Sequence, residues 1–190
     1  MESELDYNIQ DERPCEIING EVHMMASPSI NHIRINGNLH NIFDHYLDGK
    51  TCEPFNQSGV HFSEKDHYIP DEIIVCNPDI VEENFINGVP DLVVEILSPS
   101  TAKTDKNEKF LTYEKYGVKE YWIVDPVNKS VDLFHLKDGR FFPSGTYQLL
   151  ADKKYNELSD KDKANILTEI KVSLYDDFVV NVKDIFRRVK

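Results

Sequence analysis

The sequence contains no apolar run long enough to cross a bilayer, and its acidic start, MESELDY, does not resemble a signal peptide. A membrane-spanning helix needs about 20 consecutive, mainly apolar residues. These two absences predict a protein that acts in the cytoplasm and has no membrane partner.

Cysteine is scarce: the chain has three, Cys15, Cys52 and Cys76, which are widely spaced and form no CxxC pair. An odd, dispersed set of this kind is typical of buried or free thiols in a reducing compartment, and it lacks the paired spacing of structural zinc sites. We therefore expect unpaired thiols, which again favours a cytoplasmic location.

Basic residues are also few, since 21 Lys and Arg stand against 34 Asp and Glu and the formal net charge is −13. This balance argues against diffuse, charge-driven binding of nucleic acid, although a local basic groove is compatible with it. The sequence has no GxGxxG, Walker A, GxSxG or HExxH motif. Nucleotide cradles, nucleophile elbows and zincin sites are therefore not indicated.

The chain does have the length and apolar content of one packed domain, with 190 residues of which 40% are hydrophobic and 11% aromatic. Residues 1–13 are acidic, and we expect them to be a flexible N-terminus. Residues 14–190 are then a single domain.

Local patterns predict an α/β fold with a mixed β-sheet flanked by helices. Asn19-Gly20 between two apolar runs predicts a β-hairpin, because a type I′ turn needs positive φ at both central residues. Apolar residues at three- and four-residue steps predict a helix over about 28–48. The runs LVVEIL at 92–97 and EYWIVD at 120–125 are typical of central strands covered on both faces, and a helix between them ends at Gly117.

The most informative feature is an acidic residue inside the most apolar run. Strand alternation puts Asp91 and Glu95 on one face, and an ionised Glu95 in a buried strand is costly unless a cation or several donors compensate it. Asp71 stands at the start of another strong strand, and carboxylates on adjacent strands form an oxygen-ligand site for Mg²⁺ or Mn²⁺. The alternative is that Asp71 and Asp91 cap strand ends while Glu95 meets a structural lysine.

Lys109 lies on the helix after this strand and shares a helix face with Tyr113, so it can point back over the sheet toward Glu95. It could instead pair with Asp105 on the helix surface, a contact worth about 0.3–0.5 kcal/mol. Glu21, just after the Asn-Gly turn, is a candidate third acid, or else an exposed hairpin glutamate.

Three histidines, His32, His40 and His45, fall on the first predicted helix. Their steps of eight and five residues do not place all three on one helix face. We therefore expect them to be solvated or to lie at the edge of the core, and not to bind one metal together.

A longer string of residues resembles a known family. Val89–Thr101 (VPDLVVEILSPST), followed by Lys109, Tyr113 and Gly117–Pro126 (GVKEYWIVDP), is similar to the Uma2 family, a group of candidate endonucleases in the PD-(D/E)XK nuclease superfamily. The similarity covers about residues 14–186. Shorter matching pieces are Glu16–Val22, Ser27–His32 and Pro70-Asp71.

The resemblance implies a restriction-endonuclease-like core in which acids on two central strands bind Mg²⁺ or Mn²⁺. Asp71 would be the superfamily's PD acid and Glu95 its (D/E) acid, with Asp91 a further candidate ligand. Leu97 stands where the superfamily lysine is expected, two residues after the glutamate. The resemblance therefore assigns the catalytic lysine to Lys109 and an extra acid to Glu21.

Two functions are compatible with these features. The first is a Mg²⁺-dependent endonuclease that hydrolyses phosphodiester bonds in DNA, working as a homodimer if it cuts both strands of a duplex. The second is a non-catalytic binding or regulatory module that keeps the nuclease fold and retains the acids as structural remnants. Hydrolysis of a small phosphoester is a third reading.

Overall fold

The computed structural model describes residues 14–98, 105–151 and 155–190. The N-terminus 1–13, which we predicted to be flexible, lies outside the described residues. Among those that are described, no helix is both long and apolar enough to cross a membrane.

A six-stranded mixed sheet forms the centre of the molecule, with strand order β11-β10-β9-β8-β6-β3. The neighbours β8 and β9 are parallel, and the other pairs are antiparallel. Val93 and Val94 in β8 and Trp122 and Ile123 in β9 are at most 4% exposed, which confirms the prediction that these two runs are the central strands. The bounds are β3 Glu53–Asn56, β6 Glu72–Val75, β8 Leu92–Ile96, β9 Glu120–Asp125, β10 Ser130–Lys137 and β11 Arg140–Gln148.

A second sheet has five strands in the order β2-β1-β5-β4-β7, so the described chain holds more than the one mixed sheet that we expected. Its first two strands are the predicted hairpin, and Asn19 and Gly20 both have positive φ, 53° and 85°, as a type I′ turn requires. The bounds are β1 Cys15–Ile18, β2 Glu21–Met24, β4 Gly59–Ser63, β5 Asp66–Tyr68 and β7 Phe85–Asn87; the short strands β12 Glu169–Lys171 and β13 Val179–Asn181 pair separately.

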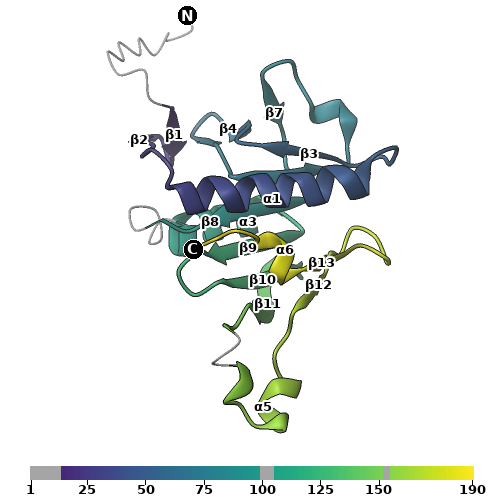
Figure 1. Cartoon of the computed structure of the whole chain (residues 1–190). Helices are drawn as coiled ribbons and strands as arrows, with labels where there is room; N and C mark the ends of the chain where they lie inside the picture. The colour runs from purple at the N-terminus through teal and green to yellow at the C-terminus, as the bar shows by residue number, and fades with distance from the viewer. Residues whose placement is uncertain (1–13, 99–104, 152–154) are drawn as a thin grey trace, which may run out of the picture.

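The longest helix, α1 (Ile30–Leu47), crosses the width of the molecule (Figure 1). Its N-cap is Ser29, whose hydroxyl accepts a hydrogen bond from the backbone N–H of His32. The C-terminal residues return to the start of α1, where the Asn31 side chain bonds the backbone of Lys190. The other helical segments are the 3₁₀ turn η1 Pro78–Ile80, the π-helical turn η2 Asp105–Lys109, α3 Phe110–Tyr116, α5 Asp160–Ala164 and α6 Val182–Ile185.

Helices cover the two faces of the six-stranded sheet. On one face, Ile35, Leu39 and Phe43 of α1 pack against Val94 and Trp122, and each of these side chains is fully buried. On the other face, α3 and the five-stranded sheet together bury a cluster that is rich in aromatic rings: Ile18, Val60, Tyr68, Ile73, Val93, Tyr113, Tyr121 and Phe141. Burial of each such side chain contributes about 1.5–3 kcal/mol.

The cysteine prediction is wrong for two of the three residues. Cys52, just before β3, and Cys76, just after β6, form a disulfide, while Cys15 is free. The antiparallel register sets Glu53 opposite Val75, so Cys52 and Cys76 are cross-strand neighbours, which their separation of 24 residues does not reveal. The cytoplasmic location stays a prediction, and it can no longer rest on these two thiols.

A buried glutamate lies under α1, on the sheet face opposite to Asp71. Glu72 is fully buried, and its Oε1 lies 3.1 Å from Nδ1 of His40. Burial, reinforced by the negative charge of Asp71, raises the pKa of Glu72 from 4.5 to about 9. At neutral pH the folded protein therefore holds a proton on Glu72 that the unfolded chain would release.

We expect Glu72→Gln to raise the melting temperature at pH 8 and to change it little at pH 5. Between the unfolded and folded pKa values the native state binds more protons, so the wild type loses stability as pH rises from about 4.5 to about 9. The amide has no proton to release and removes this loss. Melting curves from pH 5 to pH 9 test this, with the exposed Glu53→Gln as control. A Glu72→Gln effect that does not vary with pH would contradict it.

Candidate active site

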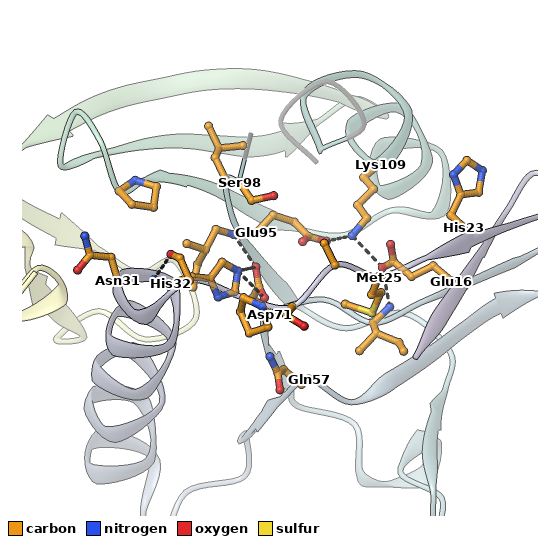
Figure 2. A pocket seen from close by; sticks show the side chains of 18 of the residues that line it. Glu16, His23, Met25, Asn31, His32, Gln57, Asp71, Glu95, Ser98 and Lys109 are labelled. Atoms are coloured by element: carbon orange, nitrogen blue, oxygen red, sulfur yellow. Dashed lines mark hydrogen bonds and ion pairs between the residues drawn. The ribbon is translucent and has the colours of Figure 1, made fainter. Parts of the chain in front are cut away.

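A pocket of about 660 Å³ opens where the two sheets and the start of α1 meet. Figure 2 shows Asp71 and Glu95 in its middle, His32 and Asn31 at one end, and Lys109 with Glu16 at the other. Residues from β1, β8, α1 and the helical segment after β8 thus face one space, although they are far apart in the sequence.

The two predicted central acids share one sheet face. Strands β6 and β8 are antiparallel with Glu72 opposite Val94, so Asp71, one residue earlier, stands opposite Glu95, one residue later. Directly opposed residues project from the same face with Cβ atoms about 5 Å apart. Both side chains are almost fully buried, with exposures of 6% for Asp71 and 3% for Glu95.

Asp71 is fixed by contacts to both the sheet and α1. Its Oδ2 accepts a hydrogen bond of 2.7 Å from the backbone N–H of Ile96, and both carboxylate oxygens lie 3.1 Å from Nε2 of His32. The side-chain amide of Asn36 donates to the backbone carbonyl of Asp71 at 2.6 Å. These contacts hold the carboxylate at the junction of β6, β8 and α1.

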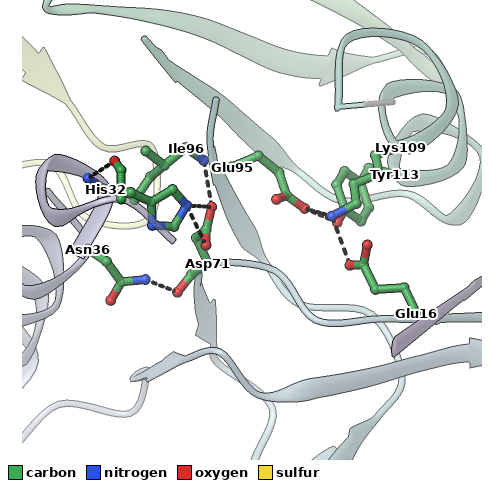
Figure 3. A network of polar contacts seen from close by, with 9 residues as sticks. Glu16, His32, Asn36, Asp71, Glu95, Ile96, Lys109 and Tyr113 are labelled. Carbon is green, nitrogen blue, oxygen red and sulfur yellow. Dashed lines mark hydrogen bonds and ion pairs between the residues drawn. The ribbon is translucent and has the colours of Figure 1, made fainter. Parts of the chain in front are cut away.

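Glu95 receives two donors on one oxygen (Figure 3). The ammonium of Lys109 lies 3.0 Å from Glu95 Oε1, and the hydroxyl of Tyr113 lies 2.6 Å from the same atom. Lys109 also pairs with Oε1 of Glu16 at 2.8 Å, and that oxygen accepts a further bond from the backbone N–H of Ile69. Lys109 is only 3% exposed, so its charge is enclosed between two glutamates.

The helical segment after β8 explains how Lys109 reaches this position. A π-helical turn ends at Lys109, and α3 continues from Phe110 until Gly117, whose φ of 90° stops it. Lys109 and Tyr113 are four residues apart and therefore point to the same side. Lys109 points toward Glu95, as predicted. The alternative pair with Asp105 involves a side chain that lies outside the described residues.

The pocket holds more negative than positive charge. Glu16, Asp71 and Glu95 are each at most 6% exposed, and against them stands the buried ammonium of Lys109. Among the buried side chains of the pocket, three carboxylates therefore stand against one ammonium. Buried charges are costly unless they are compensated, so the cluster favours an additional cation.

The donor set suits Mg²⁺ or Mn²⁺ better than a closed metal cage. Within the described part of the chain, no three His, Cys, Asp or Glu side chains gather as a ready-made metal site. Mg²⁺ does not need one, because it is commonly held by one or two carboxylates together with waters and substrate phosphates. Asp71 and Glu95 meet this requirement.

Two of the predicted site residues lie elsewhere. Asp91 stands at the opposite end of β8, where it accepts bonds from Lys119 at 2.6 Å and from the backbone N–H of Cys76 at 2.7 Å. Glu21 is exposed beside the hairpin turn and does not line the pocket. The hairpin acid that reaches the pocket is Glu16, on the buried face of β1.

His32 lines the pocket, which the histidine spacing did not indicate. It is 8% exposed and contacts Asp71, whereas His40, farther along the same helix, contacts Glu72. A single histidine in the first turn of a helix can contribute to a site without sharing a helix face with the others. The proximity of His32 to Asp71, at the start of β6, could not be deduced from helix periodicity.

The hydroxyl of Tyr113 acts as a permanent donor. Burial, with the neighbouring charge of Glu95, raises the pKa of Tyr113 well above 10, so the phenol is protonated at neutral pH. Tyr113 is fully buried. The carboxylate of Glu95 therefore faces two fixed donors.

Sequence comparisons place the chain among known proteins. Residues 2–162 match the model of the Uma2 family, described as "Putative restriction endonuclease". Two uncharacterized proteins of Synechocystis sp., slr1290 and sll1609, are 34% identical over 127 residues and 30% identical over 115 residues. The matches cover 65% and 58% of this chain and 66% and 65% of those relatives, so this chain spans just under two thirds of their length.

A solved structure has the same fold. The crystal structure of "a putative nuclease belonging to DUF820" from Anabaena variabilis superposes with a TM-score of 0.71, covering 93% of this chain and 91% of that chain at 18% identity. At this identity the similarity shows the fold alone. The predicted α/β fold with a mixed sheet flanked by helices is confirmed, with the five-stranded sheet as an addition.

Proposed function

This chain belongs to the Uma2 family, and from that membership we propose that it is a Mg²⁺-dependent endonuclease that hydrolyses phosphodiester bonds in DNA. The observation that carries the proposal is the cluster of three buried carboxylates and one buried lysine around a single pocket. A structural core has no need of this excess of negative charge, whereas a site that binds a divalent cation does.

Asp71 and Glu95 would hold the ion, since they are opposed on neighbouring strands and face the pocket. A bound Mg²⁺ would neutralise phosphate charge and lower the pKa of a water that it binds. His32 keeps the Asp71 carboxylate oriented through the contact at 3.1 Å.

Lys109 would position the attacking water and stabilise the negative charge that develops on the phosphate. Its ammonium lies 3.0 Å from Glu95 Oε1, and among the described pocket residues Lys109 is the buried lysine. A preorganised donor in a site that excludes water stabilises developing charge more than the same donor in bulk solvent. Glu16 would hold Lys109 from the other side.

The net charge of −13 bears on the DNA substrate. A polyanion approaching an acidic protein is repelled unless cations intervene, so DNA binding should depend on divalent ions. A two-fold homodimer would be needed for coordinated cleavage of both strands of a duplex.

The test combines metal binding with cleavage. We expect Mn²⁺ at 100 times its Kd to stabilise the wild type by about 2.7 kcal/mol, which is roughly 5–10 °C in melting temperature for a domain of this size. Glu95→Ala should lose the shift, because it removes a proposed ligand. Wild type should also nick supercoiled plasmid with Mg²⁺ or Mn²⁺ and stop when EDTA is added.

The control is Glu169→Ala, which removes an exposed carboxylate on β12 and should keep both the shift and the cleavage. If Glu95→Ala keeps the Mn²⁺ shift, the metal assignment is wrong. If the wild type neither binds the ion nor cuts DNA, the non-catalytic binding module becomes the better description.

A further inference from the structure

We propose that Tyr113 is a positioning residue that sets the orientation of the Glu95 carboxylate and so tunes the affinity of the site for its divalent cation. The inference rests on the proposed function and extends it to a residue that touches neither metal nor substrate. Its basis is the 2.6 Å contact from the Tyr113 hydroxyl to Glu95 Oε1.

The carboxylate of a glutamate is normally poorly fixed. A free glutamate side chain loses about 1.5–2 kcal/mol of conformational entropy when it is ordered, and its terminal torsion has broad preferences. In this site two donors on one oxygen, Tyr113 and Lys109, remove that freedom before any ion arrives. The ion then binds a carboxylate that is already ordered.

Tight packing holds the Tyr113 side chain in place, so its hydroxyl can fix the position of the Glu95 carboxylate. Its ring is fully buried and packs edge-on against Tyr68 at 5.6 Å and against Tyr121 at 5.1 Å between ring centroids. Tyr121 belongs to the central strand β9, so the position of the phenol oxygen is tied to the six-stranded sheet that also carries Glu95.

The contributions of Tyr113 and Lys109 can be separated. Lys109 is shared between Glu95 and Glu16, and neither of these contacts involves the Tyr113 hydroxyl, so we expect both to remain when it is removed. The charge proposed to act on the phosphate is therefore retained in Tyr113→Phe. What is lost is a second constraint on Glu95, which should appear in metal affinity and not in the rate at saturating metal.

The test compares Tyr113→Phe with a matched control, Tyr68→Phe. Tyr68 is also fully buried in the same aromatic cluster, and its hydroxyl donates to Thr112 Oγ1 at 2.9 Å instead of to a carboxylate. Each variant loses one buried hydroxyl and keeps its ring. Circular dichroism and melting curves establish that both are folded.

Mn²⁺ titration by calorimetry and plasmid cleavage at varied Mn²⁺ supply the readouts. We expect Tyr113→Phe to raise the Mn²⁺ Kd about 10-fold, the lower end of the range for lost outer-shell partners, and to keep cleavage at saturating Mn²⁺ within about 3-fold. Tyr68→Phe should change the Kd less than 2-fold.

Equal Kd values in both variants would overturn the inference while leaving the proposed function intact. So would a Tyr113→Phe that binds Mn²⁺ normally but cuts slowly, because the hydroxyl would then act in the chemistry. A wild type that binds no Mn²⁺ would instead overturn the proposed function, and the inference with it.

Discussion

Lys109→Gln is expected to reduce Mn²⁺-dependent plasmid cleavage at least about 100-fold, the scale of losing one preorganised charge-stabilising donor. Lys109 Nζ lies between Glu95 and Glu16 at 3.0 and 2.8 Å and is 3% exposed, so solvent cannot replace it. Glutamine keeps hydrogen-bond donors near both carboxylates and removes the charge. This keeps hydrogen bonds to both buried carboxylates, because removing one partner of a buried ion pair outright can cost about 3–5 kcal/mol.

The metal should still bind to this variant. Asp71 and Glu95 are unchanged, and removal of a nearby positive charge favours a cation, so the Mn²⁺-induced rise in melting temperature should be kept or increased. Lys115→Gln is the control, since Lys115 lies on the same helix α3 with its side chain 65% exposed. If Lys109→Gln cuts at the rate of the control, the catalytic assignment of Lys109 is wrong.

The central strands and the hairpin could be predicted because their signals are local. The runs at 92–97 and 120–125 are apolar along their whole length, which indicates strands covered on both faces, and they became β8 and β9. Asn19-Gly20 fixed the hairpin register through positive φ at both residues. The second sheet was missed because the pairing of β1 with β5 joins segments about 50 residues apart.

Burial of charge was the most useful signal for the site. Glu95 within an apolar strand predicted a compensated carboxylate, and Lys109 was the helical lysine able to reach it, as the 3.0 Å contact shows. The same reasoning found Asp71 at the start of the other apolar strand. Their catalytic and metal-binding roles stay predictions until variants are measured.

The other site residues depend on tertiary placement. Glu16 and Glu21 belong to one hairpin, and the choice between them depends on which part of it packs over Lys109, which no local pattern encodes. His32 reaches Asp71 because the first turn of α1 lies beside the start of β6. The disulfide also depends on tertiary placement, because the β3–β6 register brings its two cysteines together.

Asp71→Asn is expected to abolish both the Mn²⁺-induced rise in melting temperature and plasmid cleavage, whereas Asp91→Asn should retain both. The two aspartates make a matched pair, because each adjoins an apolar strand and each accepts a backbone N–H, from Ile96 and Cys76 respectively. An asparagine oxygen can still accept that bond, so both variants should fold. Only Asp71 lines the pocket opposite Glu95.

Asp71→Asn and Asp91→Asn each remove one negative charge, but the two carboxylates have different partners. Asp91 pairs with Lys119, whose side chain is 68% exposed, and such a pair is worth about 0–1 kcal/mol. Asp71→Asn would remove a charge from the proposed metal site, and we expect cleavage to fall at least about 100-fold. Melting curves with and without Mn²⁺, run beside cleavage assays, separate the cases. A metal response that vanishes in Asp91→Asn but survives in Asp71→Asn would move the site to the other end of β8, where Lys119 already neutralises the carboxylate.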